Sequence, residues 1–242
     1  MVIDRTSRVR DNPRTRPAKA TLSREAVVAA ALALLDEAGY AAVTMRRVAQ
    51  ALDTGPASLY VYVADRDELM AEVYDLALAA VELPGPADGD WRARLELLVG
   101  RTITTLGGHD DLALVALTKV PTGPHALRLL EETLTLLRAG GIADAACPWA
   151  ADLLDQYVTS SALERAARLR AQRALRTPAT EQAMSQAAGS ELDAVYGALP
   201  AAGFPTIHAL RASMTSAGRS GDACAAWKLR VLIDGLLADA DG

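Results

Sequence analysis

The sequence predicts an all-α protein, in which a three-helix helix-turn-helix domain is followed by a larger helical domain. Alanine and leucine are abundant, aromatic residues make up 4% of the chain, and runs of β-branched residues are few. This composition favours helices over strands. Apolar residues also recur at helical spacing along most of the 242 residues, in segments separated by glycine and proline.

The first predicted helix carries apolar residues at helical spacing between Leu22 and Leu35. Thr21 or Ser23 can cap its start, because a hydroxyl oxygen accepts a hydrogen bond from a free N–H of the first turn. Gly39 supplies a stop at its end.

Two further short helices and a tight turn complete the helix-turn-helix pattern. Thr44 caps the second helix, residues 53–55 form the turn, and Pro56 suits the first position of the third helix. A fourth helix is expected from about Arg66 to Glu82. This first domain therefore covers 21–82, including the start of the helix that leads out of it.

The segment LPGPADGD (83–90) is a break rich in proline, glycine and aspartate, and it separates the first domain from a second one, 83–242. We expect a short helix near 206–214 in the otherwise uncertain stretch 200–221. The remaining helical patterns of the second domain cover 91–106, 111–117, 124–139, 144–176, 180–198 and 222–239.

Charge is unevenly distributed along the chain, whose formal net charge is −5. Residues 1–20 hold six basic and two acidic side chains, two prolines and few apolar residues, so we expect a disordered arm. Such an arm can meet DNA phosphates or enter a minor groove. The alternative is a tail that only improves solubility.

Several classes of protein are disfavoured by the sequence. No apolar run approaches the ~18 residues needed to span a membrane, and the N-terminus lacks the apolar segment of a secretory signal. The two cysteines, Cys147 and Cys224, do not suggest a disulfide framework. We therefore expect a cytoplasmic protein with reduced thiols and no membrane partner.

The stretch TGPASLYVYVADRDELM (54–70) has the features of a helix that reads DNA, which must be short and must show its outer face to bases and phosphates. Leu59 and Val63, four residues apart, can face inward. The residues left on the outer face are small, hydroxyl-bearing or apolar: Ala57, Ser58, Val61 and Tyr62. Hydroxyl groups can donate to phosphates and Val61 can touch a thymine methyl group. Arg46 can reach guanine or phosphate, and Arg66 can anchor a phosphate.

Residues 22–70 resemble the DNA-binding domain of the TetR family of bacterial transcriptional regulators. The family pattern is present here as Gly39, Thr44, Arg47-Val48-Ala49, Leu59-Tyr60 and Arg66. Asp53 departs from it, standing where glycine is usual in the turn, but aspartate tolerates left-handed backbone geometry. The resemblance implies that Tyr60 touches the DNA backbone. The expected DNA-binding residues are Thr44, Met45, Arg46, Pro56, Ala57, Ser58, Tyr60, Val61, Tyr62 and Arg66.

Residues 83–242 resemble, more weakly, the ligand-binding and dimerisation domain of the tetracycline-repressor branch of this family. The resemblance implies a homodimer, with an interface built from the last helix, 226–239, and the long helix near 144–168. The alternative for the last helix is an ordinary place in the core. A two-fold dimer would present two recognition helices about one DNA turn apart, to a palindromic operator.

Approximate alignment with this branch implies a pocket for a small-molecule effector. Ala116 stands where the tetracycline repressors have a metal-binding histidine, so we expect neither a metal nor another cofactor. For each candidate pocket residue the alternative is a structural or exposed role. The candidates are Thr102, Thr118, Lys119, Thr133, Trp149, Asp152 and Tyr157.

These observations predict a ligand-responsive repressor that binds double-stranded operator DNA and is released by a small molecule. An activator on the same fold is an alternative, because the sign of regulation depends on where the operator lies. A helical enzyme is a further alternative, but the sequence contains no phosphate-binding loop, HExxH, G-x-S-x-G or Cys/His metal motif. We therefore expect no enzymatic activity.

Overall fold

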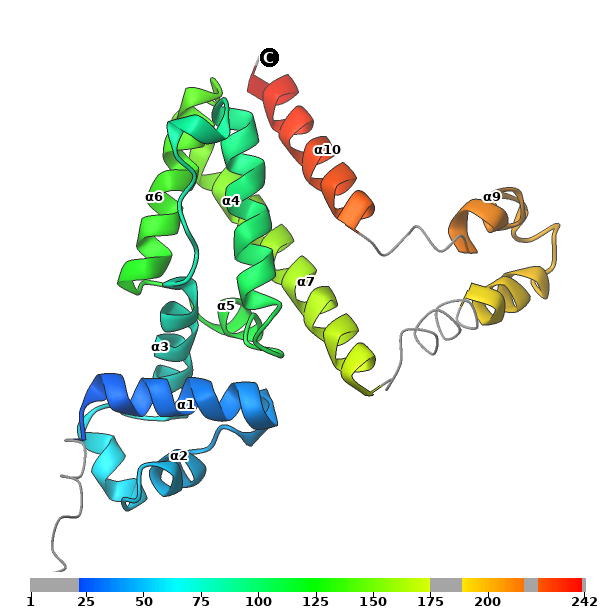
Figure 1. Ribbon diagram of the computed structural model, residues 1–242. Coiled ribbons are helices and arrows are strands. Elements are labelled where there is room, and N and C mark those ends of the chain that lie inside the picture. Colours follow the sequence, from blue (N-terminus) through cyan, green and yellow to red (C-terminus); the bar gives the residue numbers. More distant parts are fainter. Residues whose placement is uncertain (1–21, 175–188, 216–221, 241–242) are drawn as a thin grey trace, which may run out of the picture.

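The computed structural model describes residues 22–174, 189–215 and 222–240, and all regular secondary structure in these ranges is helical (Figure 1). The predicted basic arm lies outside the described residues. None of the described helices is long and apolar enough to cross a membrane.

The N-terminal domain, which we call the head, consists of three α-helices and two 3-10 helices. They are α1 (Arg24–Ala38), η1 (Tyr40–Ala42), α2 (Met45–Ala51), η2 (Pro56–Val61) and α3 (Arg66–Leu78). The predicted caps are confirmed: the Ser23 hydroxyl accepts a hydrogen bond from the Ala26 N–H at 3.2 Å, and the Thr44 hydroxyl accepts one from the Arg47 N–H at 3.3 Å. Asp53 has the left-handed φ of 50° that the turn requires.

Two elements of the head differ from their predictions. The third helix is a 3-10 helix and not an α-helix, with hydrogen bonds that span three residues, as from the Ser58 N–H to the Gly55 carbonyl oxygen at 3.0 Å. Helix α3 ends at Leu78, four residues before the predicted end. Beyond it the chain makes three-residue hydrogen bonds as far as Val81 and then reaches Pro84.

The larger domain is built around three long helices that pack side by side, α4 (Trp91–Leu106), α6 (Pro124–Ala139) and α7 (Cys147–Ala174) (Figure 1). Its other elements are η3 (Pro86–Asp88), α5 (Leu114–Thr118), α9 (Pro205–Thr215), α10 (Asp222–Ala240) and a helical stretch over 189–197. The short helix predicted near 206–214 is confirmed by α9. Residues 175–188, within the predicted helices 144–176 and 180–198, lie outside the described residues.

Helix α10 packs against α7, and its Leu229 and Ile233 are buried. The apolar stripe predicted on this helix therefore contributes to the core of its own chain. Another side of α10 exposes Trp227 and Val231, four residues apart.

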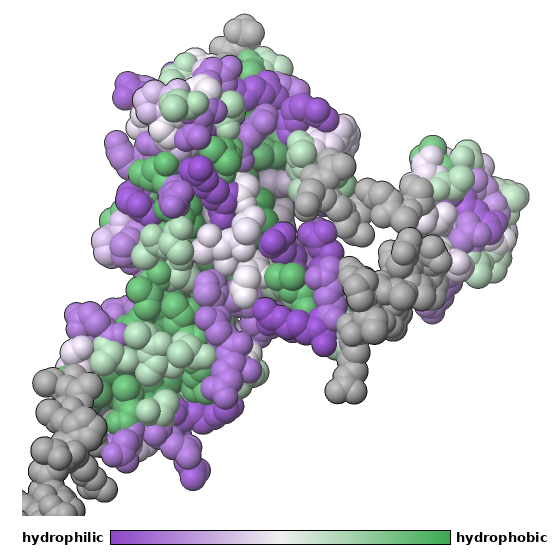
Figure 2. Space-filling model, in the orientation of Figure 1, coloured by the Kyte–Doolittle hydropathy of each residue, from purple (hydrophilic) through white to green (hydrophobic). Residues whose placement is uncertain are grey.

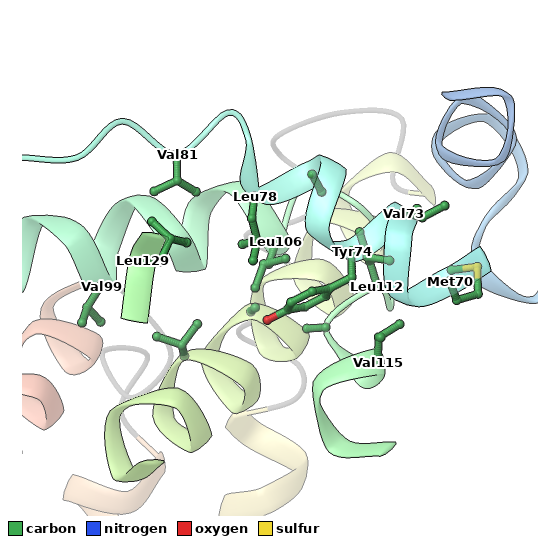
Figure 3. Close-up of a cluster of buried hydrophobic side chains, with 14 of the residues drawn as sticks. Met70, Val73, Tyr74, Leu78, Val81, Val99, Leu106, Leu112, Val115 and Leu129 are labelled. Carbon is green, nitrogen blue, oxygen red and sulfur yellow. The ribbon is translucent and has the colours of Figure 1, made fainter. Parts of the chain in front are cut away.

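One hydrophobic core runs through both domains, and α3 belongs to both parts of it. Met70 and Val73 lie on the side of α3 nearer to α1, whereas the Tyr74 side chain extends toward the larger domain (Figure 3). Leu78 of α3 and Leu106 of α4 continue this core into the larger domain. Figure 2 shows hydrophilic residues over much of the visible surface of that domain. Helix α3 therefore packs against both the head and the larger domain.

Candidate functional site

The outward side of the head carries most of the residues predicted to meet DNA. Val61 is 81% exposed and Tyr60 is 54% exposed, whereas their neighbour Leu59 is fully buried and anchors η2. Arg46, at the start of α2, lies beside Pro56 in a shallow groove that also includes the turn between α2 and η2. We call the exposed residues Arg46, Pro56, Ala57, Tyr60 and Val61 the outer face.

Three other predicted DNA-binding residues lie at the margin of the outer face. Thr44 is exposed, but its hydroxyl already caps α2. Met45 is half-buried and packs against the core, and Ser58 is also half-buried.

Tyr62 and Arg66 differ from their predicted positions, because both use their polar groups inside the head. Tyr62 is half-buried and its hydroxyl donates to the Leu22 carbonyl oxygen at 2.7 Å. Arg66 donates from Nε to the Val43 carbonyl oxygen at 2.7 Å and from Nη2 to the Tyr40 carbonyl oxygen at 3.1 Å. Its guanidinium also lies over the Tyr40 ring, 4.8 Å from the centroid. The sequence had suggested that both side chains stand free on the surface, but the structure shows that neither does.

A cavity of about 340 Å³ lies between α3 of the head and α4, α6 and α7 of the larger domain. Most of its wall is apolar, including Leu98, Leu129 and Val158. Its polar lining residues are Tyr74, Thr102, Thr133, Asp152 and Asp155. An apolar enclosure with few polar groups is the usual form of a small-molecule site.

A larger opening of about 760 Å³ lies between α1, α3 and the segment around 119–125. It is lined by charged residues that already pair with one another, such as Arg24 with Glu68 and Glu72, both at 2.5 Å. Since several of these charged side chains bind one another and the smaller cavity lies among the long helices of the larger domain, the smaller cavity is the better candidate for an effector site.

Three of the candidate pocket residues, Thr102, Thr133 and Asp152, line this cavity. The two threonine hydroxyls donate to carbonyl oxygens one turn earlier in their own helices, Thr102 to Leu98 at 2.8 Å and Thr133 to Leu129 at 2.9 Å. These two residues therefore present mainly their methyl groups and hydroxyl lone pairs.

The other four predicted pocket residues are not part of the cavity wall. Trp149 is 79% exposed, and the Tyr157 hydroxyl donates to the Ala225 carbonyl oxygen at 2.7 Å, against α10. Thr118 is exposed, and Lys119 lines the larger opening. The residues of α7 that line the cavity recur at helical spacing, so 149 and 157 lie on other faces of the helix. The lining positions are 148, 151, 152, 154, 155 and 158.

Tyr74 and Asp155 line the cavity and were missed from the sequence. Burial raises the pKa of the Tyr74 hydroxyl, and the charges of Asp155 and Asp75 add to the rise. Burial likewise raises the pKa of the Asp155 carboxyl, and the charge of Asp152 adds to it. A tyrosine within the apolar stripe of α3, four residues after Met70, is the one signal that could have pointed to this position.

Asp75, the residue after Tyr74, connects α3 to the first turn of α6. Its carboxylate accepts hydrogen bonds from the N–H groups of His125 at 3.0 Å and Ala126 at 2.9 Å. The contact is close, because a Cβ atom placed on Gly123 would lie 2.2 Å from the Asp75 side chain. An acidic group at this helix start is favourable, since the free N–H groups there carry partial positive charge.

A second connection joins the head to α7. The Tyr40 N–H donates to the Asp110 carboxylate at 2.8 Å, and Arg170 of α7 forms ion pairs with Asp110 and, at 2.6 Å, with Asp111. Burial acts to raise the pKa of Asp110, but the bonds from Arg170 and Tyr40 outweigh it and leave that pKa lowered. The head is thus bonded to both α6 and α7.

An exposed helix-turn-helix face joined through a shared helix to a domain with an internal apolar cavity defines the class of DNA-binding regulators that carry an effector site. Comparisons with known proteins identify the family. Residues 27–73 match the family described as bacterial regulatory proteins, tetR family, and residues 83–240 match the tetracyclin repressor-like C-terminal domain. The chain belongs to the TetR family.

Among its relatives, the HTH-type transcriptional repressor DrrR1 of Streptomyces coeruleorubidus is 38% identical over 153 residues. That alignment covers 61% of this chain and 55% of the relative, little more than half of its length. The crystal structure of ActR from Streptomyces coelicolor in complex with actinorhodin is 36% identical and has a TM-score of 0.76, covering 91% of this chain and 97% of that one. A structure of BioQ with its natural double-stranded DNA operator has a TM-score of 0.56 at 29% identity, covering 64% of this chain and 94% of that one.

Proposed function

We propose that this protein is a ligand-responsive transcriptional repressor, which binds operator DNA through the outer face and releases it when a small molecule occupies the cavity. The observation that carries this proposal is the position of Tyr74 and Asp75. Tyr74 lines the cavity, the next residue, Asp75, holds the start of α6, and α3 itself packs against α1 of the head.

The proposal that DNA binds to the outer face is supported by the side chains that hold this face in position from inside the head. Arg66 and Tyr62 are bonded inside the head, so they hold η2 and α2 in place without taking up the exposed side chains. Arg46 then offers a forked donor to guanine or phosphate, and Tyr60 a hydroxyl to phosphate. The structure of BioQ with its operator supports duplex DNA as the partner of a related head.

Release by a ligand requires that the two states of the protein bind the ligand with different affinity. A molecule in the cavity would contact Tyr74 directly and α6 through Leu129 and Thr133. A shift of α6 relative to α3 would strain the hydrogen bonds between Asp75 and the start of α6. We infer that this contact transmits occupancy of the cavity to the head.

A homodimer is part of the proposal, because two heads are needed to read a palindromic operator. Helices α7 and α10 each expose two large apolar side chains four residues apart, Trp149 and Leu153 on α7 and Trp227 and Val231 on α10. Covering these side chains in a two-fold interface would remove them from water. Such a protein would work in the cytoplasm and without enzymatic activity.

Operator binding is tested by selecting binding sites from random duplex DNA and measuring affinity for the selected site at two salt concentrations. We expect an enriched palindrome and a steep loss of affinity with salt. Arg46→Ala should weaken binding by about tenfold or more, the effect of losing one good base contact, and Tyr60→Phe should weaken it less. Arg138→Ala is the matched control, because Arg138 is exposed at the far end of α6. Equal affinities for all four proteins would refute the assigned face.

A further inference from the structure

The charged groups that line the cavity are all of one sign. Among the described residues it is lined by two carboxylates, Asp152 and Asp155, and by no lysine, arginine or histidine. The two carboxylates lie one turn apart on α7, and both are accessible to solvent, so they mark the open end of the cavity. The ends of the cavity therefore differ, with negative charge near solvent and apolar walls within.

Two of these polar groups have no partner among the described residues. Within the described ranges neither the Tyr74 hydroxyl nor the Asp155 carboxylate forms a hydrogen bond or ion pair, whereas Asp152 accepts one from Gln156 at 2.7 Å. Tyr74 is 3% exposed and its side chain extends from α3 into the larger domain (Figure 3). The Tyr74 hydroxyl faces the cavity, where a ligand or water can reach it, so it is a free donor for whatever fills the cavity.

Within the described ranges neither Asp152 nor Asp155 forms an ion pair, and both are exposed where the cavity opens to solvent. Partial burial of the Asp155 carboxyl, and then the nearby Asp152 charge, raise the pKa of that carboxyl. A cation beside it would reverse this, because an opposite charge within a few ångströms favours the carboxylate. Neither Tyr74 nor Asp152 supplies that charge.

We propose that the effector of this protein is an apolar molecule that carries a basic amine, with its apolar body between α4, α6 and α7 and its ammonium group at Asp155 and Asp152. The Tyr74 hydroxyl then hydrogen-bonds to a polar atom on the buried part of the molecule. This assignment rests on the cavity being the effector site of the proposed regulator.

The test uses three tricyclic probes that differ only in one substituent: 9-(aminomethyl)anthracene, its N-acetyl derivative and 9-anthraceneacetate. Each is titrated into the purified full chain by fluorescence at neutral pH. The cationic amine should bind about tenfold tighter than the neutral amide, as expected when a charge-assisted hydrogen bond is lost, and the anion should bind most weakly.

Variants locate the preference in the cavity. Asp155→Asn should reduce the advantage of the amine over the amide to about twofold or less, because it removes the unpartnered charge and keeps the shape. Asp144→Asn is the matched control, since Asp144 is an exposed aspartate that pairs with Arg138 before the start of α7, and it should keep the full advantage.

Equal binding of amine and amide, a preference for the anion, or binding of none of the three probes would each overturn the proposed ligand class. None of these results would affect the operator selection, which uses DNA alone. Conversely, a preference for the amine that depends on Asp155, in a protein that selects no DNA sequence, would uphold the ligand class and refute the regulator.

Discussion

Polar side chains behind the outer face are hydrogen-bonded within the protein, whereas two polar side chains of the cavity form no such bond with the described residues. Behind the outer face, the hydroxyl of Tyr62 and the guanidinium of Arg66 are bonded to backbone carbonyl groups of the head. In the cavity, the hydroxyl of Tyr74 and the carboxylate of Asp155 have no partner among the described residues. The two tyrosines show this difference most clearly, because the Tyr62 hydroxyl has a hydrogen-bond partner and the Tyr74 hydroxyl has none among the described residues. The two residues lie only twelve positions apart in the sequence.

The comparison teaches how each site is prepared for its partner. A surface that meets a large, rigid duplex benefits from fixed support, so its inner polar groups are satisfied before DNA arrives. A cavity that meets a small molecule can leave polar groups unsatisfied, so that the ligand gains binding energy from them. Three pairs of substitutions test this difference.

The largest expected effect distinguishes two arginines of the head. Arg66→Ala removes two hydrogen bonds from a charged group and a contact with the Tyr40 ring, and it should lower the free energy of unfolding by about 1.5–3 kcal/mol. Arg46→Ala, on the outer face, should change it by less than about 0.5 kcal/mol. Both are measured by denaturant unfolding. Similar losses in the two variants would show that Arg66 does not support the head in the way described.

The contact between the two regions is tested at Gly123. Gly123→Ala places a Cβ atom 2.2 Å from the Asp75 side chain, and displacing that carboxylate from the start of α6 should cost about 1–3 kcal/mol of unfolding free energy. Gly100→Ala serves as the control, because nothing lies within 4 Å of its added Cβ. Since Gly100 lies inside α4, alanine there should instead stabilise the protein by about 0.5–1 kcal/mol. A neutral Gly123→Ala would mean that α3 and α6 can separate at little cost.

The smallest effects are expected from removing one hydroxyl from each tyrosine. Tyr62→Phe should lower the free energy of unfolding by about 0.5–1.5 kcal/mol, the usual value of one hydrogen bond. Tyr74→Phe should leave it nearly unchanged, because the Tyr74 hydroxyl forms no hydrogen bond with the described residues that the substitution could remove. Thermal denaturation of both variants at one pH gives the comparison. If Tyr74→Phe is as destabilising as Tyr62→Phe, the Tyr74 hydroxyl has a partner that the structure does not record.

The parts of the fold that follow local rules could be predicted from the sequence. The caps at Ser23 and Thr44, the left-handed turn at Asp53 and the proline that opens η2 depend on a few neighbouring residues, and all are as expected. The helical period also placed Leu59 and Val63 in the core.

The directions of single side chains could not be predicted as well. Tyr62 was assigned to the outer face as if an α-helix continued through it, but η2 is a 3-10 helix that ends at Val61, and the tyrosine turns toward Leu22. Trp149 and Tyr157 were assigned to the pocket by approximate alignment, although the rotation of α7 turns them away from the cavity. A shift of one residue along a helix is enough to move a side chain to another face.

The sequence by itself therefore determined the all-α class and the helix-turn-helix pattern, because these depend on helical periodicity, capping residues and breaks that act over a few residues. Only the tertiary structure decided which polar groups are satisfied inside the protein and which remain for a partner. That property depends on atoms brought together from distant positions, such as Tyr62 with Leu22 and Asp75 with His125. The ligand class inferred from Tyr74 and Asp155 rests on this second kind of information.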